Sequence, residues 1–139
     1  VAFSLRAKIK ELMSNHEEAI KDYKRILEIK NNNCPLTLKN IGLIYEKIEK
    51  YPFALNYYSD SLKLCSKYFG VYKLRGKLNA KLKNNKRAID DFDKELSNDP
   101  LDYLAYFLRA KSKFELCDFE GAALDYMQAY ILRSDTLNK

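Results

Sequence analysis

Small and aromatic residues recur along this chain at a regular interval. One set of small residues consists of Ala7, Gly42, Gly76 and Ala110. A second set consists of Ala19, Ala54, Ala88 and Ala122. Four residues after each member of the second set stands an aromatic residue: Tyr23, Tyr58, Phe92 and Tyr126. A period of about 34 residues indicates stacked copies of one supersecondary unit. We therefore expect four units, at about 1–34, 35–68, 69–102 and 103–136.

Each unit contains two helical stripes of apolar residues with a short polar turn between them. In the third unit the first stripe ends near Asn79, polar residues 83–86 follow, and a second stripe runs from Ala88 to Leu96. Pro100 closes the unit, because proline opposes continuation of a helix. The pattern predicts antiparallel helix pairs at 1–13 with 16–29, 35–48 with 51–65, 69–82 with 85–97, and 103–116 with 119–133.

The small residues are expected where the two helices of a pair cross most closely. In the third unit these positions are Gly76 and Ala88. A large side chain there would force the backbones apart, at a typical overpacking cost of about 1–3 kcal/mol. The aromatic residue one turn further along the same face, Phe92 in this unit, is expected to bridge one pair to the next.

Composition fits a folded helical chain. Apolar residues make up 47% of the 139 residues, Gly (4) and Pro (3) are scarce, and no apolar run has the length of a membrane span. No signal peptide is visible, and three cysteines without CxxC spacing, Cys34, Cys65 and Cys117, argue against a disulfide framework or a zinc site. We expect each cysteine to be a free thiol that fills a packing or turn position. Because thiols stay reduced in the cytoplasm, we expect the protein to be cytoplasmic. Because the chain opens at Val1, inside a helical pattern, we expect it to be an excerpt of a longer protein.

The repeat positions identify a family resemblance. The second unit carries Leu38, Ile41, Gly42, Tyr45, Ala54, Tyr58 and Ser61. The fourth carries Tyr106, Ala110, Ala122, Tyr126 and Ala129. These residues resemble the signature of tetratricopeptide repeats, which favours an aromatic, Leu, Gly, Tyr, Ala, an aromatic, Ala and Pro. Arg6, Arg75 and Arg109 stand where the family favours Leu. The resemblance implies an all-α, right-handed α-solenoid of four antiparallel helix-turn-helix repeats in a single domain, 1–139.

The resemblance also implies that the first helix of each pair lines an inner groove. Candidate peptide-binding residues of this groove are Lys8, Lys39, Asn40, Lys47, Lys73, Lys77, Lys81, Phe107, Lys111 and Phe114. Lys73, Lys77 and Lys81 are spaced i, i+4, i+8 and so share one side of a helix, which suggests an anion-binding surface. Phe107 and Phe114 would add an apolar anchor. The alternative is that the lysines form an ordinary solvated face and that both phenylalanines pack against a neighbouring element.

A chaperone-cofactor carboxylate clamp is a sharper hypothesis within this family. Its pattern is Lys and Asn on the first inner helix, Asn on the second, and Lys with Arg on the third. Counting from the first unit, the matching positions hold Ser4, Lys8, Asn40, Gly70 and Leu74. Counting from the second unit, they hold Lys39, Leu43, Leu74, Leu104 and Leu108. Only Asn40 fits in the first register and only Lys39 in the second. The missing charged donors argue against such a clamp.

Catalytic chemistry finds little support in the sequence. The one histidine, His16, falls in the turn between the first two helices and is expected to be a packing residue. Asp90, Asp91 and Asp93 cluster on a second helix, but their spacing does not match a calcium loop, and we expect a solvated face. No phosphate-binding glycine motif occurs. We therefore expect no enzyme activity, no cofactor and no bound metal.

The sequence predicts a protein-interaction module that binds an acidic or amphipathic segment of a partner protein. The net charge of +6 favours acidic partners, although charge alone does not choose between protein and nucleic acid. RNA binding is an alternative with weaker support, because the tyrosines occupy packing positions. A second alternative is a structural segment that docks end to end on further repeats or on a second copy, in a cytoskeletal or ciliary assembly or a transport complex. We expect no membrane partner.

Overall fold

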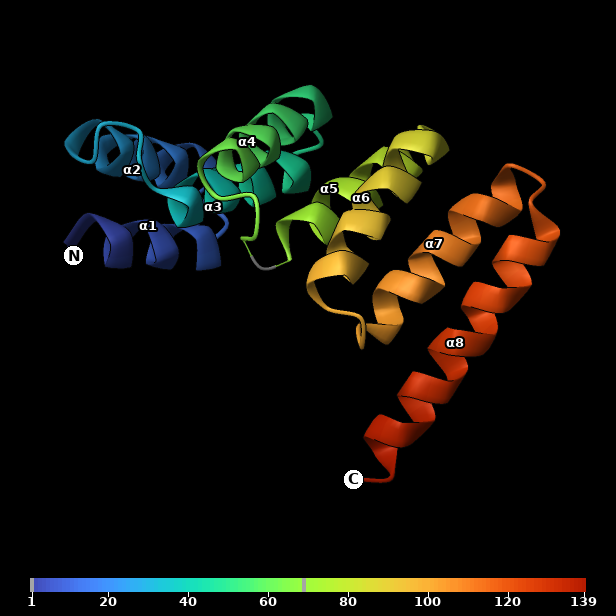
Figure 1. Ribbon diagram of the computed structural model, residues 1–139. Helices are drawn as coiled ribbons and strands as arrows, with labels where there is room; N and C mark the ends of the chain where they lie inside the picture. The colour runs from blue at the N-terminus through green and yellow to red at the C-terminus, as the bar shows by residue number, and fades with distance from the viewer. Residues whose placement is uncertain (1, 69) are drawn as a thin grey trace. The chain divides into compact units, whose positions relative to one another are not determined.

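The computed structural model describes residues 2–68 and 70–139, and within them it contains four successive helix pairs and no strand (Figure 1). The pairs are α1 (Ala2–Leu12) with α2 (His16–Ile29), α3 (Pro35–Lys47) with α4 (Tyr51–Leu64), α5 (Val71–Lys81) with α6 (Asn85–Asn98), and α7 (Tyr103–Glu115) with α8 (Phe119–Leu137). Val1 and Phe69, where two predicted helices begin, lie outside the described residues. The remaining predicted boundaries agree within one or two residues except at the end of α8.

Helix α8 is longer than the sequence pattern predicts. Its predicted end is residue 133, yet it continues to Leu137 and has 19 residues. No proline or glycine follows Gly121 in the sequence, so nothing in the chain stops the helix earlier. Its last turn is further held by the Thr136 hydroxyl, which donates to the carbonyl oxygen of Leu132 at 2.8 Å.

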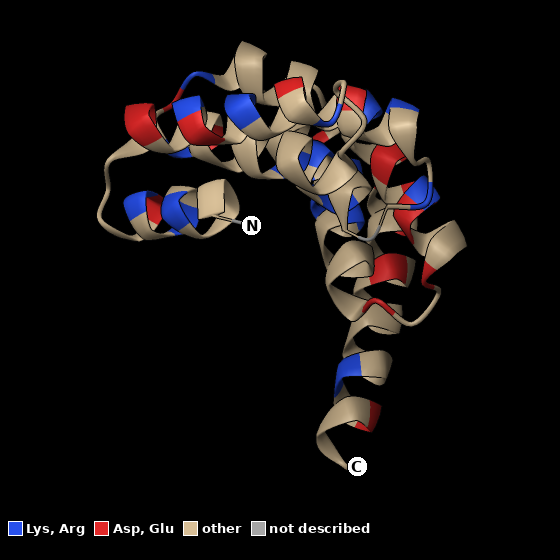
Figure 2. Cartoon of the chain, turned by 90° about the vertical axis from the view of Figure 1, so that its left-hand side faces the viewer, with Lys and Arg blue, Asp and Glu red and all other residues tan. Residues whose placement is uncertain are grey.

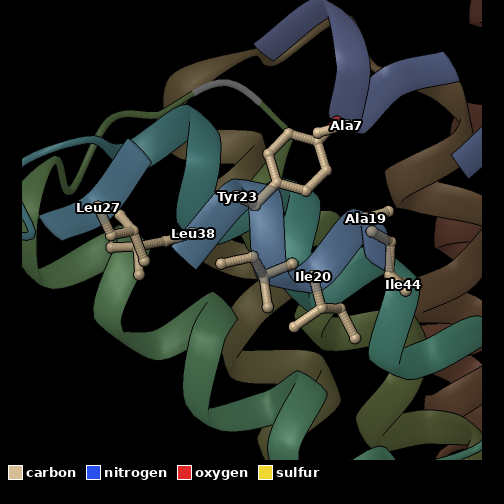
Figure 3. Close-up of a cluster of buried hydrophobic side chains, with 8 residues drawn as sticks. Ala7, Ala19, Ile20, Tyr23, Leu27, Leu38 and Ile44 are labelled. Atoms are coloured by element: carbon tan, nitrogen blue, oxygen red, sulfur yellow. The ribbon is translucent and has the colours of Figure 1, made fainter. Parts of the chain in front are cut away.

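The chain divides into two compact units, residues 1–71 and 72–139, and each is described by itself. In the first unit, one buried cluster joins α1, α2 and α3. Figure 3 shows the ring of Tyr23 beside Ala7, and Leu27 beside Leu38. The apolar stripes of consecutive helices therefore form a shared core, as a repeat of helix pairs requires.

The glycines mark close helix crossings within a pair, as predicted. A Cβ atom added to Gly42 would lie 2.7 Å from a ring carbon of Tyr58, and one added to Gly76 would lie 2.7 Å from a ring carbon of Phe92. Each aromatic ring thus fills the crossing of its own pair. Tyr23 also belongs to the buried cluster that includes Leu38 of α3, while its ring lies beside Ala7 of its own pair (Figure 3).

The turn inside each pair has the same backbone conformation. The left-handed residue of each turn is Ser14 (φ 60°), Glu49 (φ 61°), Lys83 (φ 65°) or Cys117 (φ 63°). These positions recur at the same interval as the small residues of the helix crossings. A left-handed residue ends one helix and reverses the chain, although none of the four is glycine. The four turns are therefore equivalent, and Cys117 occupies the turn position expected for it.

Candidate functional site

The candidate groove residues all lie on the first helices of the pairs. In the first unit, Lys8 is on α1, while Lys39, Asn40 and Lys47 are on α3. In the second unit, Lys73, Lys77 and Lys81 are on α5, and Phe107, Lys111 and Phe114 are on α7. Because the two units are described separately, the residues form two candidate surfaces, one on each unit.

The lysines of the first unit largely have partners within the chain. Glu11, whose side chain is only 8% exposed, lies 3.4 Å from Lys8 and 3.3 Å from Lys47. The hydroxyl of Tyr23 also donates to Glu11 at 3.3 Å. Lys39 lies over the ring of Tyr68, 5.5 Å from its centroid. Lys47 therefore links α3 to α1 through Glu11, whereas Lys8 pairs with Glu11 within α1.

In the second unit, the three lysines of α5 do not form the uniform ladder that the spacing suggests. Lys73 is mostly buried, and its ammonium group lies 2.7 Å from the carboxylate of Asp102, the N-cap residue of α7. Lys73 therefore joins two repeats and is not a free cation. Lys77 and Lys81 are exposed.

Lys77 and Lys111 occupy the same repeat position on α5 and α7. Both are exposed, and neither has an ion pair with any other described residue. Each directly follows the small residue of its crossing, Gly76 or Ala110, and so projects from the equivalent face of its helix. Lys77 and Lys111 are therefore exposed lysines of the predicted basic surface for which the described part of the chain provides no ion-pair partner.

Phe107 and Phe114 flank Lys111 along α7. They are 43% and 54% exposed, although each has one aromatic neighbour. Phe107 makes an edge-to-face contact with Tyr126 at a centroid distance of 5.5 Å, and Phe114 makes one with Phe119 at 5.2 Å. The spacing i, i+4, i+7 places both rings and the lysine on one face of the helix.

Among the described residues, three arginine–aspartate ion pairs with buried aspartates, which sequence reasoning missed, join the two helices of a pair. They are Arg6–Asp22, Arg75–Asp91 and Arg109–Asp125. In each, the guanidinium group donates two hydrogen bonds of 2.7–3.0 Å to a carboxylate 16 residues later. The prediction that the aspartate cluster of α6 is a solvated face is wrong for Asp91, which is 3% exposed. It is buried because α5 supplies an arginine at the position where the family favours leucine.

The sequence does contain a signal for these pairs. An arginine followed by an aspartate at this same separation recurs in three of the four repeats. In the second repeat both charges are absent together, and Ile41 and Tyr57 stand at the equivalent positions. The arginine position and the aspartate position are therefore both charged in three repeats and both uncharged in the second.

In two of these pairs, Arg6–Asp22 and Arg109–Asp125, the charges shift the pKa values of both partners. The hydrogen bond from Arg6 lowers the pKa of Asp22 below its ordinary value. Burial alone would raise the pKa of Asp125, but hydrogen bonds from Arg109 and Lys113 outweigh burial and lower it. The hydrogen bond to Asp125 in turn raises the pKa of Arg109. Both carboxylates therefore stabilise the fold in their ionised form.

Other residue types that carry chemistry are dispersed. Within residues 2–68 and 70–139, no group of three or more His, Cys, Asp or Glu is placed to hold a metal ion. His16 is the first residue of α2, and its Nδ1 atom is buried without a hydrogen-bond partner among these residues. None of the helices described is both long and apolar enough to cross a bilayer.

The sequence matches no family model and no curated protein. The structure is similar to a MamA fragment from Desulfovibrio magneticus RS-1, with 21% identity and a TM-score of 0.87 over 94% of this chain and 73% of that chain. It is also similar to a tetratricopeptide repeat protein from Parabacteroides merdae, with 19% identity and a TM-score of 0.86 over 91% of this chain and 50% of that one. The first tetratricopeptide domain of Spaghetti (RPAP3), bound to the HSP90 peptide SRMEEVD, has 20% identity and a TM-score of 0.75 over 84% of this chain and 94% of that chain. The chain therefore has the tetratricopeptide-repeat fold, an all-α solenoid of helix pairs.

Proposed function

We propose that this chain is a non-enzymatic protein-interaction module whose inner helices bind an acidic segment of a partner protein. Support comes first from the fold, because stacked helix pairs present an extended surface to a ligand. A protein of the same fold, Spaghetti (RPAP3), is seen with a peptide bound. That peptide contains acidic residues, and the present chain has a net charge of +6.

The observation that carries the proposal is the exposed pair Lys77 and Lys111 on the first helices of the second unit. Neither cation is neutralised by another described residue, unlike Lys73 beside Asp102. Two half-exposed phenylalanines, Phe107 and Phe114, lie on the face of α7 that also carries Lys111. A ligand with carboxylates and one or two apolar side chains would satisfy both kinds of group.

The expected affinity is modest. An exposed ion pair contributes about 0.2–1 kcal/mol, and burying part of an aromatic ring adds to it. Because the charges are exposed to solvent, added salt screens them and weakens binding. We therefore expect micromolar binding that depends on salt, with the carboxylates of the ligand as the main determinant.

The test is the affinity of a labelled peptide rich in Asp and Glu with two leucines, measured by fluorescence anisotropy. The variant Lys77→Glu/Lys111→Glu is expected to weaken binding by about tenfold, which corresponds to roughly 1.4 kcal/mol. The matched control is Lys86→Glu/Arg87→Glu on α6, which makes the same change in net charge at two exposed residues.

Equal losses in the two variants would show that net charge alone attracts the peptide and would overturn the proposal. Unchanged binding in the Lys77/Lys111 variant would overturn it as well. A peptide with Gln in place of Asp and Glu is expected to bind more weakly and to lose the salt dependence.

A further inference from the structure

Two of the three cysteines lie at the same end of one helix pair in the first unit. Cys34 is the N-cap residue of α3, and Cys65 is the C-cap residue of α4. These two helices are antiparallel and packed together, so the start of α3 lies beside the end of α4 (Figure 1). A hydrogen bond joins the two ends, because the hydroxyl of Ser61 on α4 donates to the carbonyl oxygen of Pro35 at 2.9 Å. Cys34 directly precedes Pro35, and the backbone N–H of Cys65 donates to the carbonyl oxygen of Ser61 at 3.0 Å, so each cysteine is attached to one side of this contact.

One tyrosine lies near both sulfur atoms. The backbone N–H of Tyr68 donates to the carbonyl oxygen of Cys65 at 3.0 Å. The ring of Tyr68 is next to α3, where the ammonium nitrogen of Lys39 lies 5.5 Å from the ring centroid. Burial raises the pKa of the Tyr68 phenol, and the neighbouring thiols of Cys34 and Cys65 each raise it further. The two thiols therefore come from opposite helices to the surroundings of a single phenol.

Cys34 has the surroundings of a reactive thiol. It lines a cavity of about 500 Å³, whose wall also contains Lys8 and Lys30. The hydroxyl of Thr37 donates to the sulfur atom of Cys34 at 3.1 Å. Helix α1, which contributes to the wall and starts beside the N label in Figure 2, carries more Lys and Arg than Asp and Glu. A sulfur atom that gains negative charge as it attacks an oxidant thus has a hydrogen-bond donor beside it and cations in the same cavity.

The cysteine pair is a property of this one repeat and is not required by the fold. In the third and fourth repeats the equivalent positions hold no cysteine, and they are Tyr68 with Asp99 and Asp102 with Arg133. The helix pairs of those repeats form without two sulfur atoms at these positions. The reason for the two cysteines is therefore to be sought in the chemistry of sulfur.

We propose that Cys34 and Cys65 are a redox-active dithiol, at which a peroxide forms a reversible disulfide between the start of α3 and the end of α4. The sulfur of Cys34 attacks one oxygen of hydrogen peroxide, the O–O bond breaks, and a sulfenic acid and one water form. The sulfur of Cys65 then attacks the sulfenic sulfur, and an S–S bond forms as the hydroxyl group leaves with the thiol proton as a second water. Two electrons pass from the sulfur atoms to the peroxide. The dithiol lies in the first unit and is independent of Lys77 and Lys111 in the second.

The test uses the full chain, first reduced and then treated with a few equivalents of hydrogen peroxide. The intact mass is expected to fall by the mass of two hydrogen atoms. Tryptic digestion without reductant, followed by mass spectrometry, is expected to give one linked pair of peptides that contains Cys34 and Cys65. Dithiothreitol is expected to restore the reduced mass, because a small thiol in excess reverses the bond by exchange.

Three serine variants distinguish the dithiol from general oxidation. Cys117→Ser removes the exposed third cysteine and is expected to leave the disulfide unchanged. Cys34→Ser and Cys65→Ser are each expected to abolish it. In Cys65→Ser the sulfenic acid on Cys34 has no thiol to react with, so dimedone, which traps sulfenic acids, is expected to label Cys34.

Three outcomes would overturn the proposal. One is oxidation of Cys34 and Cys65 only to sulfinic or sulfonic acids, or only to links between two chains. Another is a linked peptide that contains Cys117. The third concerns stability, because a bond between two ends that already lie together is expected to raise the thermal midpoint of the oxidised chain by several degrees. A midpoint that is unchanged or lower would show that the bond does not form between the native ends of α3 and α4.

Discussion

The ion pair between Arg75 and Asp91 offers a sharp test of how the helix pairs are held together. The arginine donates two hydrogen bonds of 3.0 and 2.7 Å to the carboxylate and lies over the ring of Tyr72. The Asp91 side chain is 5% exposed, and that of Arg75 is 21% exposed. Replacing Arg75 with leucine, the residue that the family favours, would leave a buried carboxylate with only a 3.3 Å hydrogen bond from Asn79.

The magnitude follows from the burial of the carboxylate. Removing one partner of a buried ion pair lowers the free energy of unfolding by about 3–5 kcal/mol. Because about a fifth of the Arg75 side chain is exposed to solvent, we expect Arg75→Leu to fall at the low end, about 3 kcal/mol. The second repeat shows how the loss can be recovered. It holds Ile41, Tyr45 and Tyr57 at the positions of Arg75, Asn79 and Asp91, with the two tyrosine rings stacked at 5.5 Å. The triple variant Arg75→Ile/Asn79→Tyr/Asp91→Tyr copies this apolar set.

The assay is urea unfolding followed by far-ultraviolet circular dichroism. Arg75→Leu is expected to lower the free energy of unfolding by about 3 kcal/mol, and the triple variant to recover most of that loss. Arg6→Leu is expected to have a smaller effect, because the Arg6 side chain is 55% exposed. A loss below about 1 kcal/mol for Arg75→Leu, which is the range of a surface pair, would show that the Arg75–Asp91 pair does not hold α5 and α6 together. A triple variant that is no more stable than the single one would show that the apolar set does not replace the pair.

Two further predictions concern the second unit. Gly76→Ala is expected to lower the free energy of unfolding, because overpacking against Phe92 (about 1–3 kcal/mol) exceeds the gain of roughly 1 kcal/mol in helix propensity. Adding Phe92→Leu to the Gly76→Ala variant should relieve the overpacking. Urea midpoints that do not change in Gly76→Ala would argue against a tight crossing. Since the folded-state pKa of Asp125 is lowered, its stabilisation is present above the ordinary value of 3.8 and is lost as pH falls through the lowered pKa. Melting temperatures across this range should fall less steeply for Asp125→Asn than for the wild type, and identical slopes would contradict the assignment.

The helices were predictable because the local signals agree with the packing. Small residues at Gly42 and Gly76 meet aromatic rings at the crossings, and the turns between helices are polar. The end of α8 was not predicted, because the apolar stripe fades after Ile131 while no residue stops the helix. Periodicity marks the buried face of a helix but not its length.

The candidate site was only partly predictable. Helical spacing correctly places Lys73, Lys77 and Lys81 on one helix, but it carries no information on which carboxylate each lysine meets. Lys73 is bound by Asp102, 29 residues away, and this pairing depends on how successive repeats stack. The prediction that Asp91 is solvated is wrong for the same reason, because Arg75, which pairs with it, lies on the preceding helix. Partners on other helices are visible only through comparison of the repeats with one another.

The most direct measurement is a titration of the isotopically labelled chain with the acidic peptide, followed by backbone amide shifts in NMR spectra. The largest shifts are expected on α5 and α7, around Lys77 and Lys111, and they are expected to vanish in the Lys77→Glu/Lys111→Glu variant. Shifts confined to the second helices α6 and α8, or unchanged by the charge reversal, would contradict the claim that the first helices of this repeat array bind an acidic partner.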